Sequence, residues 1–308
     1  MQFTDNLPTG LTNISNVNVI ASGIPAPSIE ISGTTLLVPD SADDTFDLLQ
    51  SAVVTITFDA EIDTIVTPGQ TITNTGSVTW TSVEGDNPDE RTSGDGPING
   101  GGLNDYETDD DVAFDIDNAA FSKALESTSA SHTTGNDLTI GEIVMYTLAI
   151  TLPEGIVPSL QVIDQLPEGL AYVVGTLSID TGNFNGSVPA ASVTAGGDSG
   201  DDITIDFGVI TTTADNDATN NTFTLRFQAQ VMDEDDVIGL NPPGQTTLVN
   251  RATLQISSQP TIPSNDVNVT VVEPQMEISK TFNPDRAAAN DVVQVTLIVT
   301  NTGYIRGI

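Results

Sequence analysis

Hydrophobic and polar residues alternate in short runs along most of the chain, and clusters of Gly, Pro, Asn and Asp separate these runs. A period of two places the apolar side chains of a strand on one face, and the intervening clusters are typical of turns. Such runs occupy residues 143–150, 161–164, 203–207, 222–231 and 247–256, and no convincing amphipathic helical pattern accompanies them. The pattern therefore predicts an all-β fold of antiparallel β-sandwich domains.

Two of the predicted strands carry the only lysines of the chain, Lys123 and Lys280. Each lysine shares a strand face with large apolar residues two positions away, such as Phe121 and Phe282. An unpaired ammonium in an apolar layer is costly. We therefore expect each lysine to meet a polar partner inside a sandwich.

The chain repeats itself after about 160 residues. The motif Asp-x-Leu-Pro-x-Gly-Leu occurs at 5–11 and at 164–170, and the lysine strand at 121–125 returns at 278–282. Three further segments also recur, with 53–61, 73–79 and 111–116 matching 222–230, 249–255 and 266–271. We infer a repeat over 1–117 that lacks its first strands, a complete repeat over 118–274, and the first two strands of another repeat over 275–308.

The two ends of the chain fit each other in this repeat. Joined head to tail, the spacing from Thr300 to the next Asp5 equals the spacing from Thr151 to Asp164. We therefore predict that residues 276–308 of a preceding unit complete the first repeat. The units are either successive parts of a longer chain or separate subunits that donate strands. A fragment cut at arbitrary points is the alternative.

Two further polar residue types recur with the lysines. Asp5 and Asp164 precede the Leu-Pro motif, and Asn74 and Asn250 lie on a late strand of each repeat. Alternation places all four on the apolar face of their strands. Lys, Asp and Asn would then face one core in each repeat, where they must find each other or remain unsatisfied.

The order of these motifs resembles a known family. Lys-Thr-x-Asn-Pro at 280–284 precedes Asp-Val-Val-x-Val-Thr-Leu-x-Val-Thr-Asn-Thr-Gly at 291–303, and the Asp-x-Leu-Pro-x-Gly-Leu motif follows in the next repeat. This pattern is similar to the conserved-repeat domain of prokaryotic surface proteins and to the isopeptide-forming domains of bacterial pilins and adhesins. The resemblance covers nearly the whole chain and implies tandem immunoglobulin-like domains at the cell surface, outside the cell. The motifs are more specific to this surface-repeat architecture than to isopeptide formation, because many such repeats are not cross-linked.

In the isopeptide-forming relatives, a buried Lys attacks the side-chain amide of an Asn beside a carboxylic acid. Carried over, the resemblance implies a bond between Lys123 and Asn250, assisted by Asp164. Burial favours the neutral amine and the protonated acid that such a step needs. The alternative is a buried ion pair between Lys and Asp, with Asn as a hydrogen-bonding neighbour.

For the first repeat, the same resemblance implies an isopeptide bond between Asn74 and Lys280 of the preceding unit, assisted by Asp5. Glu142 is a rival acid in the complete repeat, but its place directly after Gly141 indicates a turn residue. The chemistry would be autocatalytic and would need no cofactor. We find no residue pattern for an enzyme acting on another substrate.

Charge and composition exclude several partners. The chain has 43 Asp and Glu against 7 Lys and Arg, a net charge of −36. Such a polyanion repels nucleic acids and anionic lipids. There is no cysteine for a disulfide or a thiolate site. The chain also has no run of about 18 apolar residues, so no membrane-spanning helix is predicted.

Acidic residues are dense between residues 84 and 110. Calcium takes six to eight oxygen ligands, and the candidates for such a site are Asp86, Asp89, Asp95, Asp105 and Asp109. A solvated loop is the alternative, because no known calcium-loop spacing is present.

The sequence thus predicts a structural repeat unit of an extracellular fibre, pilus-like filament or surface stalk, with further copies of itself as partners. The alternative is an adhesin or surface-layer module that binds a ligand or calcium through the 84–110 loop. Accessory domains of a secreted hydrolase are a third class.

Overall fold

The computed structural model describes residues 1–39, 46–80, 106–237, 239, 245–257 and 259–303. The chain divides into two compact units, Met1–Asn118 and Ala119–Ile308. Both are built from strands, as the alternation predicts, and the only helical element among the described residues is the 3-10 turn η1 (Ala218–Asn220). No helix in the described ranges is long and apolar enough to span a membrane.

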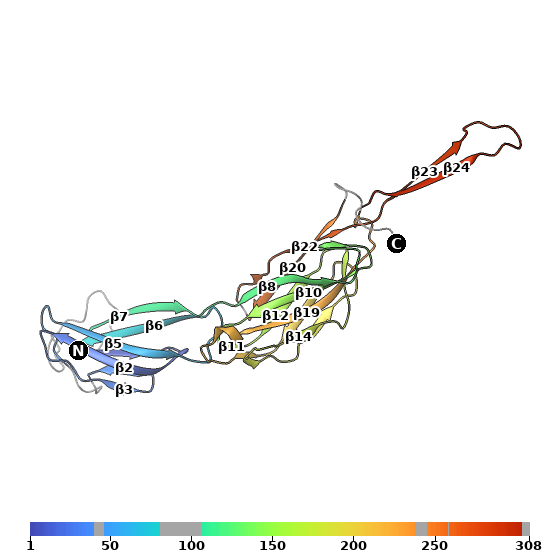
Figure 1. Ribbon diagram of the computed structural model, residues 1–308. Coiled ribbons are helices and arrows are strands. Elements are labelled where there is room, and N and C mark those ends of the chain that lie inside the picture. Colours follow the sequence, from blue (N-terminus) through green and yellow to red (C-terminus); the bar gives the residue numbers. More distant parts are fainter. Residues whose placement is uncertain (40–45, 81–105, 238, 240–244, 258, 304–308) are drawn as a thin grey trace. The chain divides into compact units, whose positions relative to one another are not determined.

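Unit 2 contains a complete two-sheet sandwich (Figure 1). One sheet has the order β13-β19-β10-β8, with β14 also on β19. Its strands are β8 (Ala120–Thr128), β10 (Ile143–Thr151), β13 (Leu170–Tyr172), β14 (Ser178–Asp180) and β19 (Thr222–Val231).

The second sheet of unit 2 has the order β16-β17-β12-β20-β22-β9, with β21 also on β20. Its strands are β9 (Asp137–Leu138), β12 (Leu160–Gln165), β16 (Ser192–Ala195), β17 (Asp202–Phe207), β20 (Thr247–Ile256), β21 (Ile262–Pro263) and β22 (Val267–Val271). A small third sheet joins β11 (Gly155–Val157), β15 (Gly186–Ser187) and β18 (Ile210–Thr212). The order of the main strands in the two large sheets is that of an immunoglobulin-like sandwich.

The core of unit 2 lies between these two sheets. Successive residues of β10, β12, β19 and β20 alternate between buried and partly exposed positions, as the period of two requires. Apolar side chains from both sheets form one continuous buried cluster that includes Leu148, Val162, Phe227 and Leu254. The strands predicted at 143–150, 161–164, 203–207, 222–231 and 247–256 are all confirmed.

Unit 1 repeats the second of these sheets but only part of the first. Its larger sheet has the order β3-β4-β1-β6-β7, and β2 pairs with β5 in a separate two-stranded sheet. The strands are β1 (Gln2–Asn6), β2 (Leu11–Ser22), β3 (Glu30–Ser32), β4 (Thr35–Val38), β5 (Val53–Ile62), β6 (Thr71–Trp80) and β7 (Tyr106–Asp115). No counterpart of β8 or β10 is present among the described residues of this unit.

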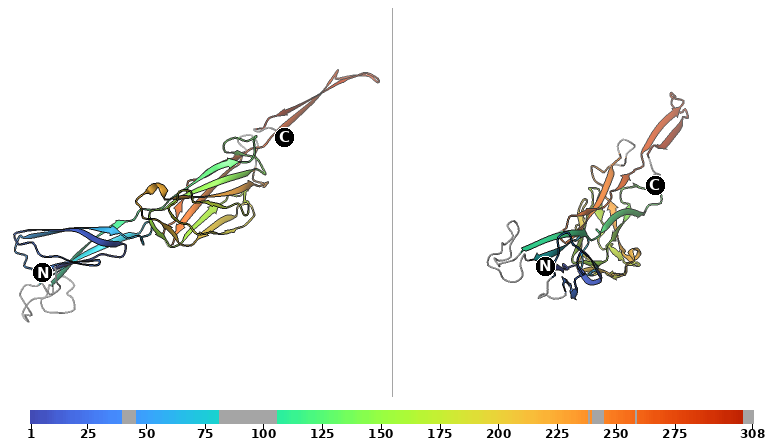
Figure 2. Two further views of the ribbon diagram at one scale, coloured as in Figure 1. Left: turned by 60° about the horizontal axis from the view of Figure 1, so that its bottom comes forward. Right: turned by 90° about the vertical axis from the view of Figure 1, so that its left-hand side faces the viewer.

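The last two strands, β23 (Met276–Asn283) and β24 (Gln294–Asn301), form an antiparallel hairpin in unit 2. They lie side by side in the views of Figures 1 and 2 and pair only with each other. Every residue of both strands is exposed. The hairpin is therefore a two-stranded sheet with neither face covered.

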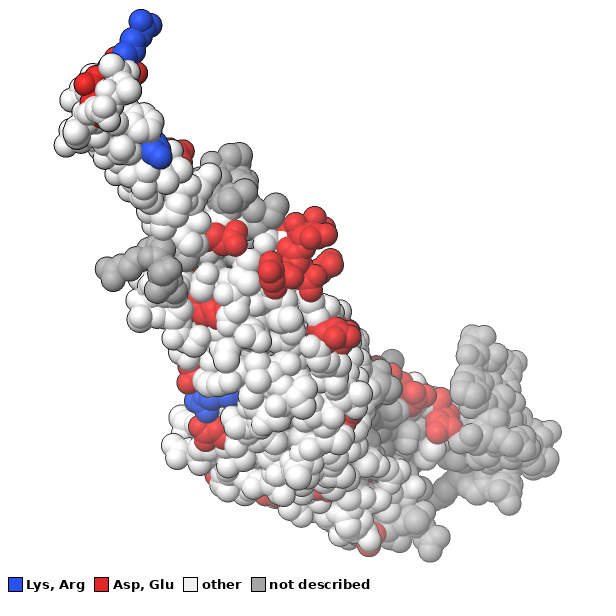
Figure 3. Space-filling view, turned by 90° about the vertical axis from the view of Figure 1, so that its right-hand side faces the viewer, with Lys and Arg blue, Asp and Glu red and all other residues white. Residues whose placement is uncertain are grey.

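Acidic residues are distributed over the surface. Figure 3 shows red acidic side chains in several separate groups, with few blue basic ones. The charge imbalance of the sequence is thus a property of the solvated surface.

Candidate functional site

The centre of the unit 2 core contains a buried ion pair between the two large sheets. Lys123 lies in the middle of β8 and Asp164 near the end of β12, and both side chains are 0% exposed. The Lys123 Nζ atom donates a hydrogen bond to Oδ2 of Asp164. It also lies 4.8 Å from the ring centroid of Tyr146 and 5.5 Å from that of Phe227, distances at which aromatic rings attract a cation.

Asn250 completes this constellation from β20. Asp164 pairs with Ala252 across the β12–β20 ladder, and Asn250 lies two residues along β20 on the same face. The side chain is fully buried, and its Oδ1 and Nδ2 atoms make no hydrogen bond of good geometry to the described residues. Burial raises the pKa of both Asp164 and Tyr146, and an interaction with the Asn250 amide opposes that rise in each, so the amide lies close to both groups. The structure therefore brings together the three residues predicted for the complete repeat.

Burial sets the protonation equilibrium of the pair. It lowers the pKa of Lys123 to about 8, against the opposing attraction of the Asp164 carboxylate. It also raises the pKa of Asp164, against the opposing effect of the Lys123 ammonium. Desolvation is the larger effect on both groups, so burial favours the neutral amine of Lys123 and the protonated acid of Asp164.

Two neighbours of Lys123, Tyr146 and Asn265, were not predicted from the sequence. Tyr146 is fully buried beside the ammonium, and its hydroxyl makes no hydrogen bond of good geometry in the described part of the chain. Its parity within the 143–150 run could have placed it on the inward face. Asn265 accepts a hydrogen bond from the Lys123 backbone N–H at 3.0 Å and donates one to the Lys123 carbonyl at 2.8 Å. No sequence signal indicates this contact, which holds β8 against the opposite sheet.

The corresponding residues of unit 1 are only partly assembled. Asn74 on β6 donates a hydrogen bond from Nδ2 to Oδ2 of Asp5 on β1 at 2.9 Å. Asp5 is 5% exposed, and burial raises the pKa of its carboxyl against the opposing effect of the Asn74 hydrogen bond. The Oδ1 atoms of both residues have no partner among the described residues.

Lys280 belongs to the β23–β24 hairpin of unit 2. Its side chain is exposed, and its Nζ atom lies 5.5 Å from the ring centroid of Phe282 on the same strand. The expectation that this lysine is buried in an apolar layer is therefore wrong for the single chain. Its side chain lies on the predicted face of the strand, the one that also carries Ile278 and Phe282.

Glu142 holds a turn of unit 2. Its buried carboxylate accepts hydrogen bonds from the backbone N–H groups of Ala130 at 3.0 Å and Thr139 at 2.9 Å, and from the Thr133 hydroxyl. This confirms the interpretation of Glu142 as a turn residue.

Four of the calcium candidates, Asp86, Asp89, Asp95 and Asp105, lie outside the described residues. Asp109 lies on β7 opposite Ser77 and is exposed. The described ranges contain no group of three or more side chains able to hold a metal ion.

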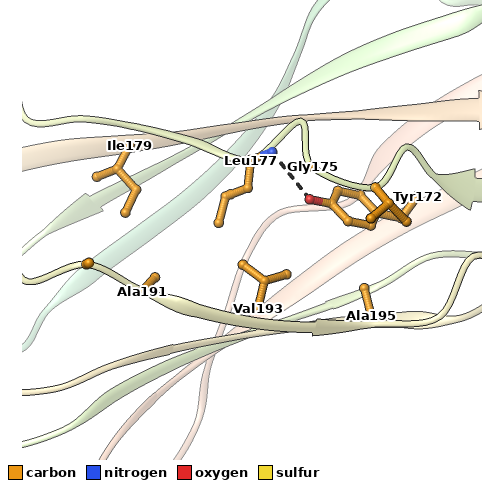
Figure 4. A pocket seen from close by; sticks show the side chains of 9 residues that line it. Tyr172, Gly175, Leu177, Ile179, Ala191, Val193 and Ala195 are labelled. Atoms are coloured by element: carbon orange, nitrogen blue, oxygen red, sulfur yellow. Dashed lines mark hydrogen bonds between the residues drawn. The ribbon is translucent and has the colours of Figure 1, made fainter.

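An open apolar cavity of about 550 Å³ lies beside β14 and β16 (Figure 4). Its walls include Leu177, Ile179 and Val193, and the Tyr172 hydroxyl accepts a hydrogen bond from the Leu177 backbone N–H at 3.3 Å. None of the lining residues carries a charge. The Tyr172 hydroxyl is the one polar side-chain group among these lining residues.

Comparison with known proteins gives likenesses of fold. No family model matches the chain, and no curated protein matches it. The C-terminal domain of the AgI/II polypeptide BspA of Streptococcus agalactiae aligns with 88% of this chain and 84% of its own, at 11% identity and a TM-score of 0.39. The T6 backbone pilin of serotype M6 Streptococcus pyogenes aligns with 81% of this chain and 50% of its own, at 10% identity and a TM-score of 0.33. The collagen binding domain of Erysipelothrix rhusiopathiae surface protein RspB aligns with 88% of this chain and 84% of its own, at 13% identity and a TM-score of 0.27.

Proposed function

We propose that this chain is a structural repeat unit of an extracellular fibre, pilus-like filament or surface stalk, assembled head to tail and stabilised by Lys–Asn isopeptide bonds. The observation that carries the proposal is the fully buried set of Lys123, Asp164 and Asn250, in which the Asn250 amide lies beside the ion pair of the other two. This amide makes no hydrogen bond of good geometry, and a buried amide in that state is a costly arrangement for an ordinary core. It is the group that a neighbouring amine would attack.

The reaction requires only atoms of these side chains. The neutral Lys123 amine attacks Cγ of Asn250, while the protonated carboxyl of Asp164 donates a hydrogen bond to Oδ1 and stabilises the developing charge. The new Nζ–Cγ bond forms as the Cγ–Nδ2 bond breaks. Nδ2 leaves as ammonia with one proton from the amine, and Asp164 relays that proton. This is a single intramolecular event without turnover.

The position of the bond suits a mechanical role. It would join β8, the first strand of the sandwich, to β20, a late strand of the opposite sheet. Tension entering at β8 would then pass through the bond to β20 and bypass most of the strands between them. A chain without cysteine could obtain in this way the covalent tie that disulfides give other extracellular domains.

An equivalent bond in the first repeat would join Asn74 to Lys280 of the preceding copy, with Asp5 as the assisting acid. Asp5 and Asn74 are already hydrogen-bonded to each other in unit 1.

Mass spectrometry of the proteolysed chain tests the cross-link. We expect a branched peptide that joins the Lys123 segment to the Asn250 segment and is lighter by one ammonia than the two linear peptides. Lys123→Met and Asp164→Ala chains are the controls and should give only linear peptides. Recovery of the Lys123 peptide in linear form alone from the unsubstituted chain would overturn the covalent proposal.

A further inference from the structure

Tyr146 is a fully buried tyrosine that lies at the site of Lys123, Asp164 and Asn250. It belongs to β10, the neighbour of the lysine strand β8, and its side chain points into the core between the two large sheets. Its ring centroid lies 4.8 Å from Lys123 Nζ. Burial raises the pKa of the Tyr146 hydroxyl, and an interaction with the Asn250 amide opposes that rise. The hydroxyl therefore lies beside the amide that Lys123 would attack.

Four buried polar atoms of this site make no hydrogen bond of good geometry within the described ranges. They are the Tyr146 hydroxyl oxygen, Oδ1 of Asp164, and Oδ1 and Nδ2 of Asn250. Buried polar groups in native cores are nearly always hydrogen-bonded, so four such atoms together indicate a site arranged for chemistry and not only for packing. A hydroxyl donates one hydrogen bond and an amide oxygen accepts one. The Tyr146 hydroxyl and Oδ1 of Asn250 thus match as donor and acceptor.

The proposed reaction needs a hydrogen-bond donor that keeps its proton throughout. When the Lys123 amine adds to Cγ of Asn250, an electron pair of the carbonyl bond moves onto Oδ1, which becomes an oxyanion. Asp164 donates to this oxygen only while it is protonated, yet it also relays the proton from the amine to the departing ammonia. The Tyr146 hydroxyl stays protonated at neutral pH, because burial raises its pKa from an already high value. It can therefore hold the oxyanion while Asp164 moves the proton.

We propose that Tyr146 is a catalytic residue of the cross-linking reaction, whose hydroxyl donates a hydrogen bond to Oδ1 of Asn250 and stabilises the oxyanion. This inference rests on the proposed function and adds a residue to it. As the oxyanion collapses, the carbonyl bond forms again, the Cγ–Nδ2 bond breaks, and Nδ2 leaves as ammonia with the proton relayed by Asp164. In the product, the amide oxygen keeps its hydrogen bond from Tyr146, and the new amide N–H donates to the Asp164 carboxylate. The product thus supplies partners for polar atoms that lack them before the bond forms.

Strand pairing does not by itself require a tyrosine at this position. The β23–β24 hairpin has the same Lys–Leu register as β8 and β10, and Val295 takes the place of Tyr146 there. Tyr146 pairs with Leu125, two residues beyond the lysine of β8, and Val295 pairs with Phe282, two residues beyond the lysine of β23. The hydroxyl is therefore a feature of the complete site in unit 2 and not of the strand pair.

Tyr146→Phe tests this role, because it removes the hydroxyl and keeps the ring. Chains made in a short cell-free translation pulse are sampled over time after translation is stopped, and mass spectrometry measures the fraction of branched Lys123–Asn250 peptide. Loss of one donor to an oxyanion typically slows a reaction by about 100-fold or more. Tyr146→Phe should therefore cross-link about 100-fold more slowly than the unsubstituted chain.

Tyr172→Phe is the matched control. Tyr146 and Tyr172 pack against the same ring, that of Phe227, with centroids 5.6 Å and 6.1 Å away. The Tyr172 hydroxyl, however, accepts a hydrogen bond from the Leu177 backbone N–H. Its removal takes a buried hydroxyl from the same core without touching the reacting atoms. The rate of cross-linking should be unchanged.

Two measurements separate a catalytic effect from a structural one. In the Asn250→Ala background the Tyr146 hydroxyl has no amide to bind, so Tyr146→Phe should leave the urea midpoint of unit 2 unchanged. The pH dependence of the cross-linking rate follows the neutral fraction of Lys123 and the protonated fraction of Asp164. Tyr146→Phe should lower the rate at every pH and keep the midpoints of this profile. A shifted midpoint would mean that the substitution acts through the burial of Lys123 or Asp164.

Three outcomes would overturn the role of Tyr146: equal rates for Tyr146→Phe and the unsubstituted chain, an equal slowing by Tyr172→Phe, or shifted midpoints in the pH profile. Each of these leaves the cross-link itself in place, because the unsubstituted chain still yields the branched peptide. Absence of that peptide from the unsubstituted chain would instead refute the proposed cross-link, and the role of Tyr146 with it.

Discussion

Asn250→Ala separates a cross-linked core from one held by an ion pair. Residues 123 and 250 enclose a loop of roughly 130 residues, and the chain-entropy model gives about 5 kcal/mol of stabilisation for a covalent bond that closes such a loop. If the bond forms, the substitution should cost unit 2 close to this amount. If only the Lys123–Asp164 pair exists, the substitution removes a buried amide that makes no hydrogen bond of good geometry. The cost should then be about 1 kcal/mol or less.

The two units need separate readouts in this experiment. Trp80, the only tryptophan of the chain, lies in unit 1, so its fluorescence during urea denaturation follows that unit. Hydrogen exchange of peptides from β8, β10 and β19, measured by mass spectrometry at the same urea concentrations, follows unit 2. We expect Asn250→Ala to lower the stability of unit 2 by about 5 kcal/mol and to leave the Trp80 transition unchanged.

The repeat supplies a matched control, Asn74→Ala. Asn74 is the equivalent residue of unit 1, where it donates a hydrogen bond to Asp5 at 2.9 Å. In the monomeric chain its replacement should cost about 1 kcal/mol, detected by Trp80 fluorescence alone. A loss below about 1 kcal/mol for Asn250→Ala would refute the covalent reasoning, since the chain-entropy model gives about 5 kcal/mol for a closed loop of this length.

Three further predictions concern unit 2, and urea denaturation with the same exchange readout checks the first two. In the Asn250→Ala background, adding Asp164→Ala leaves the Lys123 ammonium without its ion-pair partner and should cost about 3–5 kcal/mol more. Lys123→Met should recover most of this loss. Equal stability with and without Asp164 would contradict the prediction. In the same background, the free energy of unfolding should rise by about 3 kcal/mol between pH 8 and 10.5. Over this range Lys123 is neutral in the folded chain, where its pKa is about 8, but still protonated in the unfolded chain. Lys123→Met should abolish that slope, and a slope that survives must come from another group. Glu142→Gln should cost about 1–3 kcal/mol by weakening the hydrogen bonds to Ala130, Thr133 and Thr139. Faster hydrogen exchange confined to residues 130–142 would identify this local loss, and unchanged exchange there would count against it.

Strand alternation predicted the direction of the key side chains because strand geometry fixes it locally. Lys123, Asp164 and Asn250 all point inward, as their parity requires. The alignment of β8 against β10 and β12 against β20 depends on pairings between segments far apart in the chain. The internal repeat supplied the order of these segments, but no pattern gave the close approach of Asn265 to the Lys123 backbone.

Lys280 shows where local reasoning stops. The hairpin has the same Lys–Leu register as β8 and β10, so strand geometry and sequence pattern treat the two lysines alike. Among the described residues a second sheet lies over the face of Lys123 and not over that of Lys280, and that sheet supplies both the desolvation and the Asp164 partner. Burial and charge pairing are therefore properties of the covering sheet and not of the lysine strand. It follows that a cross-link at Lys280 would require a second sheet to cover the hairpin first, because only a covering sheet supplies the desolvation and the acid that the chemistry needs.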